Sequence, residues 1–336
     1  MSSNALTNNV QMKIKEIILP FSLLPEKYSK DILNELKLPY FSNLISKAKF
    51  NCKSQIDLYS FFLPYEKRLF KINENNSPKI SYDFMENFKI NKKNGYWFIL
   101  QPVHFHLASD HAVLTDYRNL KLDEETSIKF FNLASPIFKE NQFDLVYGNS
   151  YFWFFRADKF KNLKTCCPDV ACGKNIDIWM PKGEHEFEWL KLHNQIQMVW
   201  HNCVSNEERE LQGKDKLNGV WIWGGSNKKN LSINLPNLIK NIYFINSNNT
   251  FHKTNDEFCF INNLIPYAIS ENWSGWIKEM RNLDNFFFKK LQNDLNSGEI
   301  HKLKFILSDN YRLAEWTLNR INIKKFWIKP SLKKLQ

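Results

Sequence analysis

Short apolar runs alternate with segments of helical period through much of this 336-residue chain, and this alternation constrains its fold more than any other feature. Residues 96–100 and 112–114 favour strands because they are aromatic or aliphatic and short. Residues 123–133 favour a helix, since acidic residues occupy its first turn, where they suit the helix dipole. Strands that alternate with helices form layered structures, so the pattern predicts an α/β fold.

The middle of the chain continues this pattern. Residues 143–147 and 151–155 predict a hairpin whose turn contains Gly148 and Asn149. Residues 186–201 predict an amphipathic helix. We expect this helix to direct Leu190, Ile196 and Val199 towards the core.

The two ends of the chain differ in their expected structure. Residues 12–75 read as helical, with apolar residues three and four apart in 31–36 and 41–48. Towards the other end, strands are expected at 242–245, 257–261 and 302–307. A long helix is expected at 273–295, and Gly298 is placed to end it.

Three segments follow from these patterns: an N-terminal helical segment (1–95), an α/β segment (96–226) and a C-terminal α/β segment (227–336). The ends can be separate domains or two halves of one core that receives 96–226 as an insertion. We favour the insertion, because the Trp-Gly-Gly sequence before residue 226 resembles a point where the chain re-enters such a core.

The composition predicts a folded protein, since 43% hydrophobic and 15% aromatic residues can bury enough apolar surface to offset chain entropy. The net charge of +11 suggests a polyanion partner, yet only seven of the 46 basic residues are Arg. Nucleic-acid surfaces cluster their charge and use Arg for forked contacts, so no nucleic-acid partner is expected. The densest basic run, 324–334, favours a solvated surface, with a polyanion contact as the alternative.

The location expected from the sequence is cytoplasmic. The N-terminus lacks the pattern of a signal peptide, and the most apolar stretches are far shorter than the about 20 residues of a membrane span. No membrane contact is therefore expected. The six cysteines are expected to be reduced.

No set of residues has the spacing of a metal or cofactor site. His104 and His106 would face one side of a strand, but Asp110 and His111 follow too late for the usual binuclear pattern. Cysteines 166, 167, 172 and 203 lack the paired spacing of zinc knuckles. Glycine-rich phosphate loops are absent too, so we predict no metal, no cofactor and no catalytic residue.

Residues 201–226 contain the strongest candidate binding residues. Arg209 offers a planar set of donors suited to phosphate or carboxylate, and glycines let backbone amides approach a ligand. The alternative is a helix and loop followed by a buried strand whose tryptophans belong to the core. The predicted ligand-binding residues are Arg209, Arg118, Asn206, Asn218, His201, Lys214, Gly224 and Gly225.

Residues 96–226 resemble the insert domain of archaeal-type cofactor-independent phosphoglycerate mutases. The resemblance rests on Asp116 and Arg118, on 169–173, and on a closing pattern. That pattern comprises His201, Asn206, Arg209, Gly213, Asn218, Trp221, Trp223, Gly224 and Gly225. It implies a domain that faces a phosphorylated or carboxylate ligand.

Over most of its length the chain is similar to a bacterial family of RpfE-type regulatory proteins, which are also phosphoglycerate-mutase-like. The shared elements are Leu-Pro at 19–20 and 38–39, the run 64–68, Pro-Val-His at 102–104, and a late Trp-helix-Gly-strand element from 276 to 303. This resemblance implies a phosphatase-like degenerate core with an inserted α/β domain and an N-terminal helical segment.

The chain departs from the mutases where catalysis would reside. It lacks an N-terminal metal-binding strand, and residues 203–205 and Ser226 replace the family's His-Pro-Val and closing Gly. Without metals nothing neutralises a transferred phosphoryl group. We therefore expect a non-catalytic regulatory or ligand-sensing protein. The alternatives are an active metal-dependent phosphoglycerate mutase and a scaffold for protein partners, in which Arg209 pairs with Glu186 or Glu188.

Overall fold

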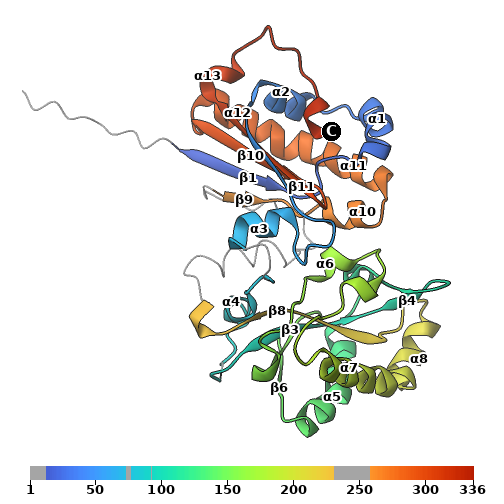
Figure 1. The fold of residues 1–336 in the computed structure, drawn as a ribbon. Coiled ribbons are helices and arrows are strands. Elements are labelled where there is room, and N and C mark those ends of the chain that lie inside the picture. Colours follow the sequence, from blue (N-terminus) through green and yellow to red (C-terminus); the bar gives the residue numbers. More distant parts are fainter. Residues whose placement is uncertain (1–12, 73–76, 92, 231–257) are drawn as a thin grey trace, which may run out of the picture. The chain divides into compact units, whose positions relative to one another are not determined.

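The computed structural model describes residues 13–72, 77–91, 93–230 and 258–336. Its contacts group the chain into two units. Unit 1 comprises 1–55, 246–268 and 272–336, and unit 2 comprises 56–245 and 269–271. Both units contain sheets and helices, so the α/β class expected from the sequence is confirmed (Figure 1).

Unit 1 contains a mixed five-stranded sheet. Its strands lie in the order β2 (Lys49–Gln55), β11 (Arg312–Asn319), β10 (Lys302–Ser308), β1 (Ile14–Leu19) and β9 (Phe258–Phe260). β1 runs parallel to β10 and β9, whereas β11 is antiparallel to both β10 and β2. The strands expected at 257–261 and 302–307 are thus confirmed over the described residues, while 242–245 lies outside them.

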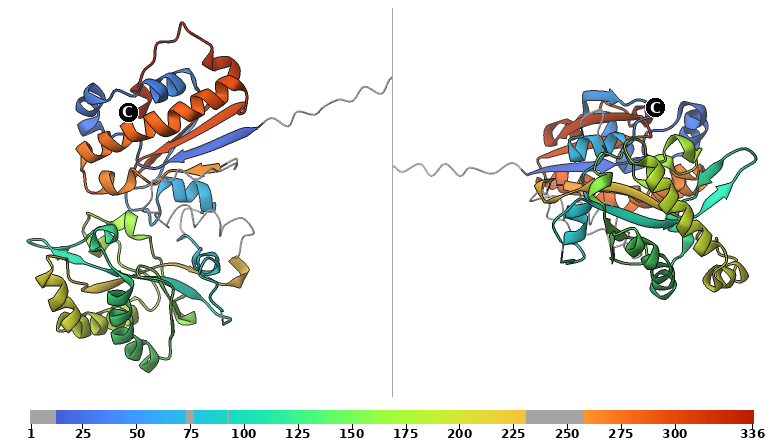
Figure 2. Two further views of the ribbon diagram at one scale, coloured as in Figure 1. Left: turned by 180° about the vertical axis from the view of Figure 1, so that it is seen from behind. Right: turned by 60° about the horizontal axis from the view of Figure 1, so that its bottom comes forward.

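Helices cover one face of this sheet. They are α1 (Glu26–Glu35), α2 (Pro39–Lys47), α11 (Trp273–Leu283), the π-helical segment η5 (Asp284–Phe288), α12 (Lys289–Ser297) and α13 (Arg320–Ile323). Figure 2 shows α11 to α12 as one rod across the sheet. Buried Asp284 accepts hydrogen bonds from the backbone amides of Tyr40 and Phe41 at 3.3 and 2.6 Å. Its carboxylate therefore caps the start of α2.

The expectation that 12–75 is helical is wrong for two segments, β1 and β2. β1 is a short apolar run, and such a run does not distinguish a strand from a buried helix. β2 is exposed along its whole length, and among the described strands it pairs with β11 alone, so it has no buried face to produce an apolar alternation. The helices expected around 31–36 and 41–48 are confirmed as α1 and α2.

Unit 2 contains an antiparallel four-stranded sheet. Its strands lie in the order β6 (Asp144–Tyr147), β7 (Trp153–Arg156), β3 (Trp97–Val103) and β8 (Gly219–Ser226). A separate ribbon joins β4 (Phe105–Leu107) to β5 (Ala112–Leu114). The expected hairpin and the strands at 96–100 and 112–114 are confirmed.

The helices of unit 2 lie on both faces of its sheet. α5 (Glu124–Glu140) and α7 (Glu186–His201) pack on one face, and α4 (Ser81–Glu86) packs on the other through Phe84, which contacts Phe154 and Trp223. Shorter elements complete the unit. They are α3 (Pro64–Phe70), η1 (Tyr117–Leu120), η2 (Asp158–Phe160), α6 (Pro168–Ala171), η3 (Ile176–Ile178), α8 (Val204–Leu211) and η4 (Lys228–Asn230).

The inward face of α7 differs from the prediction. Ile196 is buried as expected, but Leu190 and Val199 are each 41% exposed. The buried stripe instead contains Trp189, His193, Ile196 and Trp200, at spacings of four, three and four residues. The large aromatic side chains set the rotation of the helix, because they bury more surface than the aliphatic ones.

The three sequence segments remain a proposal about domains. In the described parts of the chain, no helix is long and apolar enough to cross a membrane.

Candidate functional site

Arg118 lies in a buried network with two carboxylates. Its Nε is 2.7 Å from Asp116 Oδ1, and its Nη2 is 2.7 Å from Asp169 Oδ1. Burial opposes the charge on Arg118, but the two carboxylates hold its pKa well above the usual value. Burial also raises the pKa of Asp169, against the opposing effect of Arg118. Because two acids surround one base, an incoming anion would meet net negative charge, which favours a structural role for Arg118.

Arg209 joins three parts of unit 2. It is 2% exposed, and it donates from Nε to the Asp215 carbonyl and from Nη2 to the Leu120 carbonyl, each at 2.8 Å. Its Nη1 is buried and has no hydrogen-bond partner in the parts of the chain that the structure describes. Burial lowers the pKa of Arg209. The side chain therefore ties α8 to the following loop and to η1.

The scaffold alternative named Glu186 and Glu188 as partners of Arg209, and this pairing is wrong. Glu186 accepts a hydrogen bond from the Gly183 amide. Glu188 pairs with Lys159 and His185. Both acids thus have partners at the start of α7, and Arg209 binds backbone carbonyls instead.

The two predicted asparagines hold backbone segments together. Asn206 donates to the carbonyls of Trp200 and Leu217 and accepts from the Leu217 amide, all within 2.8 Å. Asn218 forms a reciprocal pair with the backbone of Phe105, at 2.7 and 2.8 Å. These amides extend the backbone pairing beyond the end of β8.

The predicted glycines are explained by close packing within β8. A Cβ on Gly225 would lie 2.4 Å from Phe98 Cε1, and the backbone of Gly224 has a φ of +69°. Half-buried Lys214 donates its backbone amide to the Arg209 carbonyl at 2.9 Å. Lys214 thus lies in the loop after α8, and Gly224 and Gly225 lie in the buried strand β8. A helix, a loop and a buried strand with core tryptophans were the alternative considered for 201–226.

The residues considered for metal binding are separate from one another. His104 Nδ1 is 2.8 Å from the Lys216 carbonyl, whereas His106 is exposed on β4. All six cysteines lie in the described residues, and no disulfide joins any two of them. Within the described ranges, no group of three His, Cys, Asp or Glu side chains is placed to hold a metal ion.

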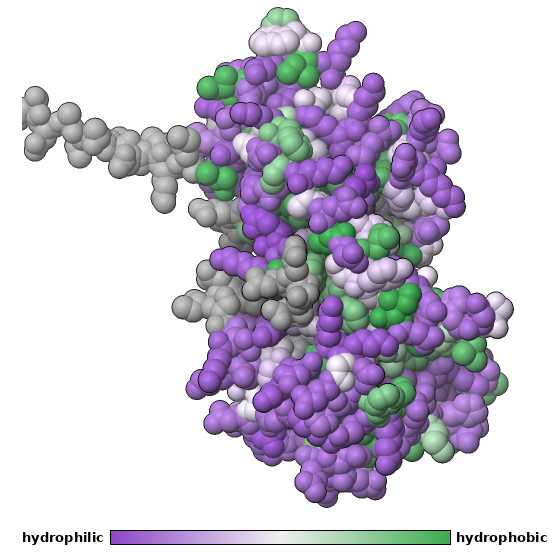
Figure 3. Space-filling view, in the orientation of Figure 1, coloured by the Kyte–Doolittle hydropathy of each residue, from purple (hydrophilic) through white to green (hydrophobic). Residues whose placement is uncertain are grey.

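Unit 2 contains a cavity of about 580 Å³, which we call the unit 2 cavity. Its apolar lining includes Phe105, Leu107, Ile176, Met180, Leu190 and Met198. Leu107 and Met198 are 79% and 75% exposed. The face drawn in Figure 3 is largely hydrophilic, with apolar residues in small patches. Apolar side chains left exposed around a cavity are typical of a ligand or partner site.

His193 contributes a buried polar group to this cavity. The side chain is 4% exposed, and neither ring nitrogen has a hydrogen-bond partner among the described residues. Its ring contacts Phe105 edge to face, with the centroids 5.6 Å apart. Burial lowers the pKa of His193 to about 4, against a smaller opposing effect of the adjacent Asn194 side chain, which lies near the ring but forms no hydrogen bond of acceptable geometry with it. His193 is therefore neutral at pH 7 and presents one donor and one acceptor.

Gly219 leaves room for this arrangement. A Cβ at that position would lie 2.3 Å from Phe105 Cε2 and 3.0 Å from His193 Nε2. Any larger residue would therefore displace both rings.

The other polar residues of the unit 2 cavity already have partners or face solvent. Gln197 donates to the Asn218 carbonyl at 2.9 Å. Exposed His201 contacts Asn202 at 2.8 Å. Of the predicted binding residues, His201 and Asn218 line this cavity, and Arg118, Arg209, Asn206, Lys214, Gly224 and Gly225 do not. The sequence analysis missed His193, although its place in the stripe from Trp189 to Trp200 indicates a buried histidine.

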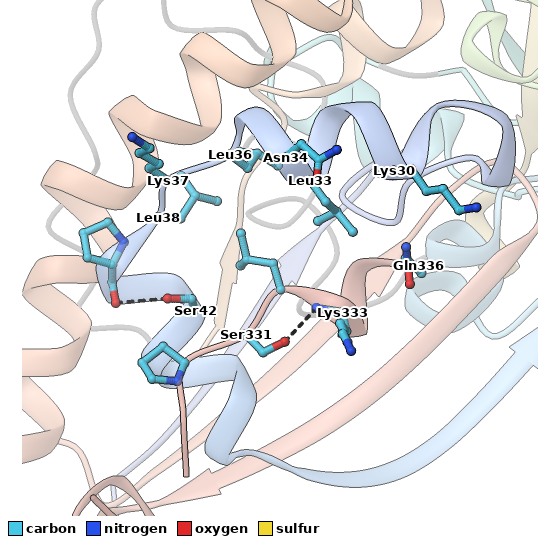
Figure 4. A pocket seen from close by; sticks show the side chains of 13 residues that line it. Lys30, Leu33, Asn34, Leu36, Lys37, Leu38, Ser42, Ser331, Lys333 and Gln336 are labelled. Carbon is cyan, nitrogen blue, oxygen red and sulfur yellow. Dashed lines mark hydrogen bonds between the residues drawn. The ribbon is translucent and has the colours of Figure 1, made fainter. Parts of the chain in front are cut away.

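Unit 1 contains a groove of about 670 Å³, which we call the unit 1 groove. Lys30 and Lys37 line it from α1 and the residues that follow, and Lys333 lines it from the C-terminal segment (Figure 4). These three side chains are exposed, and none has a partner among the described residues. No Asp or Glu lines the groove. The lining side chains therefore carry a net positive charge.

Two solved structures are similar to this chain. The PH0037 protein from Pyrococcus horikoshii is 12% identical, with a TM-score of 0.48, over 92% of this chain and 88% of that one. The cofactor-independent phosphoglycerate mutase from Thermoplasma acidophilum is 11% identical, with a TM-score of 0.38, over 92% and 90%. Both scores lie below 0.5, so neither similarity carries an inference about activity.

No protein-family model matches the sequence. No curated protein matches it either.

Proposed function

We propose that this chain is a non-catalytic regulatory or ligand-sensing protein that binds a small molecule in the unit 2 cavity. The observation that carries the proposal is His193, a buried polar side chain whose two ring nitrogens have no hydrogen-bond partner among the described residues. Leaving such a group unsatisfied costs about 1–3 kcal/mol. A ligand with a polar end group would remove this cost, because it supplies the missing hydrogen bond.

The lining of the cavity suits a ligand with a largely apolar body. Phe105 and Ile176 are buried in its wall, while Leu107, Leu190 and Met198 are exposed. Covering these side chains removes apolar surface from water, which contributes about 25 cal/mol per Å². The proposed ligand therefore combines an apolar body with one small polar group.

A neutral fluorescent probe, N-phenyl-1-naphthylamine, tests the proposal. Its fluorescence should rise on titration with the protein, because its rings leave water. Met198→Glu should weaken its binding at least about tenfold, since a charge would replace an apolar wall group. Phe187→Glu is the matched control, because Phe187 is 78% exposed on the same helix but does not line the cavity. Equal binding to all three proteins would exclude the cavity as the site.

A phosphorylated ligand is a second candidate, and the unit 1 groove favours it. Lys30, Lys37 and Lys333 give the groove three positively charged side chains, and no Asp or Glu lines it. Titration with 3-phosphoglycerate should raise the thermal midpoint, by an amount that reflects about 2.7 kcal/mol at a hundredfold the dissociation constant. Lys333→Gln should reduce this shift. A shift that is the same in both proteins would place the phosphate elsewhere.

We also propose that the chain belongs to the RpfE-type regulatory proteins. Support comes from the sequence elements named above, including the runs at 64–68 and 102–104. Direct ligand contacts by Arg118 and Arg209 stay a prediction, and their buried partners favour a positioning role for both. A protein partner bound at the exposed side chains around the cavity remains the alternative to a small ligand.

A further inference from the structure

We propose that the ligand of the unit 2 cavity is a monocarboxylic acid whose carboxylate pairs with protonated His193. This inference rests on the proposed function, since it names the chemical class that the same cavity takes.

The charges around the cavity select this head group. No Lys or Arg lines the cavity, so no fixed positive charge is available for a phosphate or sulfate dianion. His193 can acquire one positive charge, and this matches one carboxylate. A buried ammonium group would find a single acceptor nitrogen on His193. The carboxylate of Asp177 also lines the cavity, but it is exposed, so water and salt screen its charge.

Other titratable groups near His193 are few. Phe105, Trp189 and Gly219 contact the ring or lie beside it, and none of them titrates. Asp177 and His201 also line the cavity, and both are exposed. His193 is therefore the group whose protonation should change when a carboxylate enters.

Binding then takes up one proton. Without a ligand His193 is neutral at pH 7, because burial lowers its pKa to about 4. The ligand enters as a carboxylate, the imidazole accepts one proton from solution, and no covalent bond of the ligand changes. Above about pH 5 both free partners lack this proton, so the affinity should fall about tenfold for each unit of rising pH until the pKa of the complex is passed.

The experiment uses 2-naphthoate as the probe and the full chain as the protein. Calorimetric titration at pH 6 in two buffers of different ionisation enthalpy should show uptake of about one proton per ligand bound. Affinity at pH 6 should exceed that at pH 8 by at least about tenfold. The Cε1 proton resonance of His193 should move to the imidazolium position in the complex.

Variants separate the head group from the cavity. His193→Phe should weaken 2-naphthoate at pH 6 at least about tenfold and remove the pH dependence, while N-phenyl-1-naphthylamine still binds. His193→Gln, which keeps hydrogen bonding but cannot titrate, should also remove the pH dependence. His106→Gln is the matched control and should leave both properties unchanged, because His106 is exposed and does not line the cavity.

Two results overturn the inference in different ways. If the neutral naphthylamine binds the cavity but 2-naphthoate binds without proton uptake, the carboxylate class is wrong and the proposed function stands. If neither probe binds, both fail. Loss of proton uptake in His106→Gln would also contradict the assignment to His193.

Discussion

The unit 2 cavity and the unit 1 groove differ in the polar groups that they offer to a ligand. The cavity buries one neutral, unpartnered imidazole among apolar side chains. The groove exposes three ammonium groups to water. A buried group interacts strongly with one matched head group, because the local dielectric constant is low. Exposed charges attract anions of many kinds and are screened by salt.

This difference assigns separate roles to the two regions. The cavity should discriminate between ligands by their protonation and shape. The groove should respond to total negative charge and to ionic strength. Substitutions in the cavity should therefore change stability as well as binding, whereas substitutions in the groove should change binding alone.

The largest expected effect concerns the pH dependence of stability at His193. The unfolded side chain has a pKa near 6.5, whereas burial lowers the folded pKa to about 4. Between these values the unfolded state binds more protons, so stability should fall as the pH falls from about 6.5 to 4. The loss should reach about 3 kcal/mol at the acid end of this window. Urea unfolding at several pH values measures it.

His193→Phe gives the control for this measurement. Phe keeps a flat ring, removes the unsatisfied nitrogens and does not titrate, so the variant should lose less stability between pH 6.5 and 4 than the parent. It should be at least as stable as the parent at pH 7, because replacing an unsatisfied polar group with an apolar one of similar shape is neutral or stabilising. Identical pH profiles would mean that His193 is hydrated or paired in solution.

Arg209→Ala asks whether the buried guanidinium of Arg209 supports the structure of unit 2 or binds a ligand. The substitution strands the carbonyls of Asp215 and Leu120, so it should lower the free energy of unfolding by about 1–3 kcal/mol. The affinity for N-phenyl-1-naphthylamine should not change, because Arg209 does not line the cavity. Glu210→Ala, at the exposed neighbouring position, is the control. Unchanged stability with lost ligand binding would restore Arg209 as a ligand contact.

The sequence predicts the elements of this molecule better than its site. The α/β class, the hairpin across Gly148 and the long helix before Gly298 follow from local patterns, and the structure confirms them. β2 was missed because an exposed edge strand has no buried face to give a pattern.

The candidate site was less predictable, because it depends on contacts between distant residues. Arg209 and Asn206 have the chemistry of ligand contacts, but their partners are backbone carbonyls that no local pattern names. His193 escaped notice because the inward face of α7 was assigned from Leu190 and Val199. The spacing of Trp189, Ile196 and Trp200 would have placed the histidine on the buried face, and its contact with Phe105 confirms that position.

Gly225→Ala tests whether a glycine that was predicted to bind a ligand serves the packing of unit 2 instead. Its new Cβ would lie 2.4 Å from Phe98 Cε1 and 2.7 Å from Tyr96 Cε1, so the variant should lose about 1–3 kcal/mol of stability through overpacking. Thermal or urea unfolding measures the loss. Phe98→Leu should recover part of it, because it removes the ring atom that clashes. Fully additive losses in the double variant would contradict this packing explanation.

The smallest effect on stability is expected in the unit 1 groove. Lys333→Gln should change the free energy of unfolding by no more than about 0.5 kcal/mol, because the side chain is exposed and has no partner in the described residues. The same variant should weaken binding of 3-phosphoglycerate at low salt, and the difference from the parent should shrink as salt rises. Lys278→Gln is the control, because this lysine is exposed in unit 1 but does not line the groove. A large stability loss in Lys333→Gln would contradict the difference between the unit 1 groove and the unit 2 cavity. It would show that Lys333, like His193, contributes to the stability of its unit.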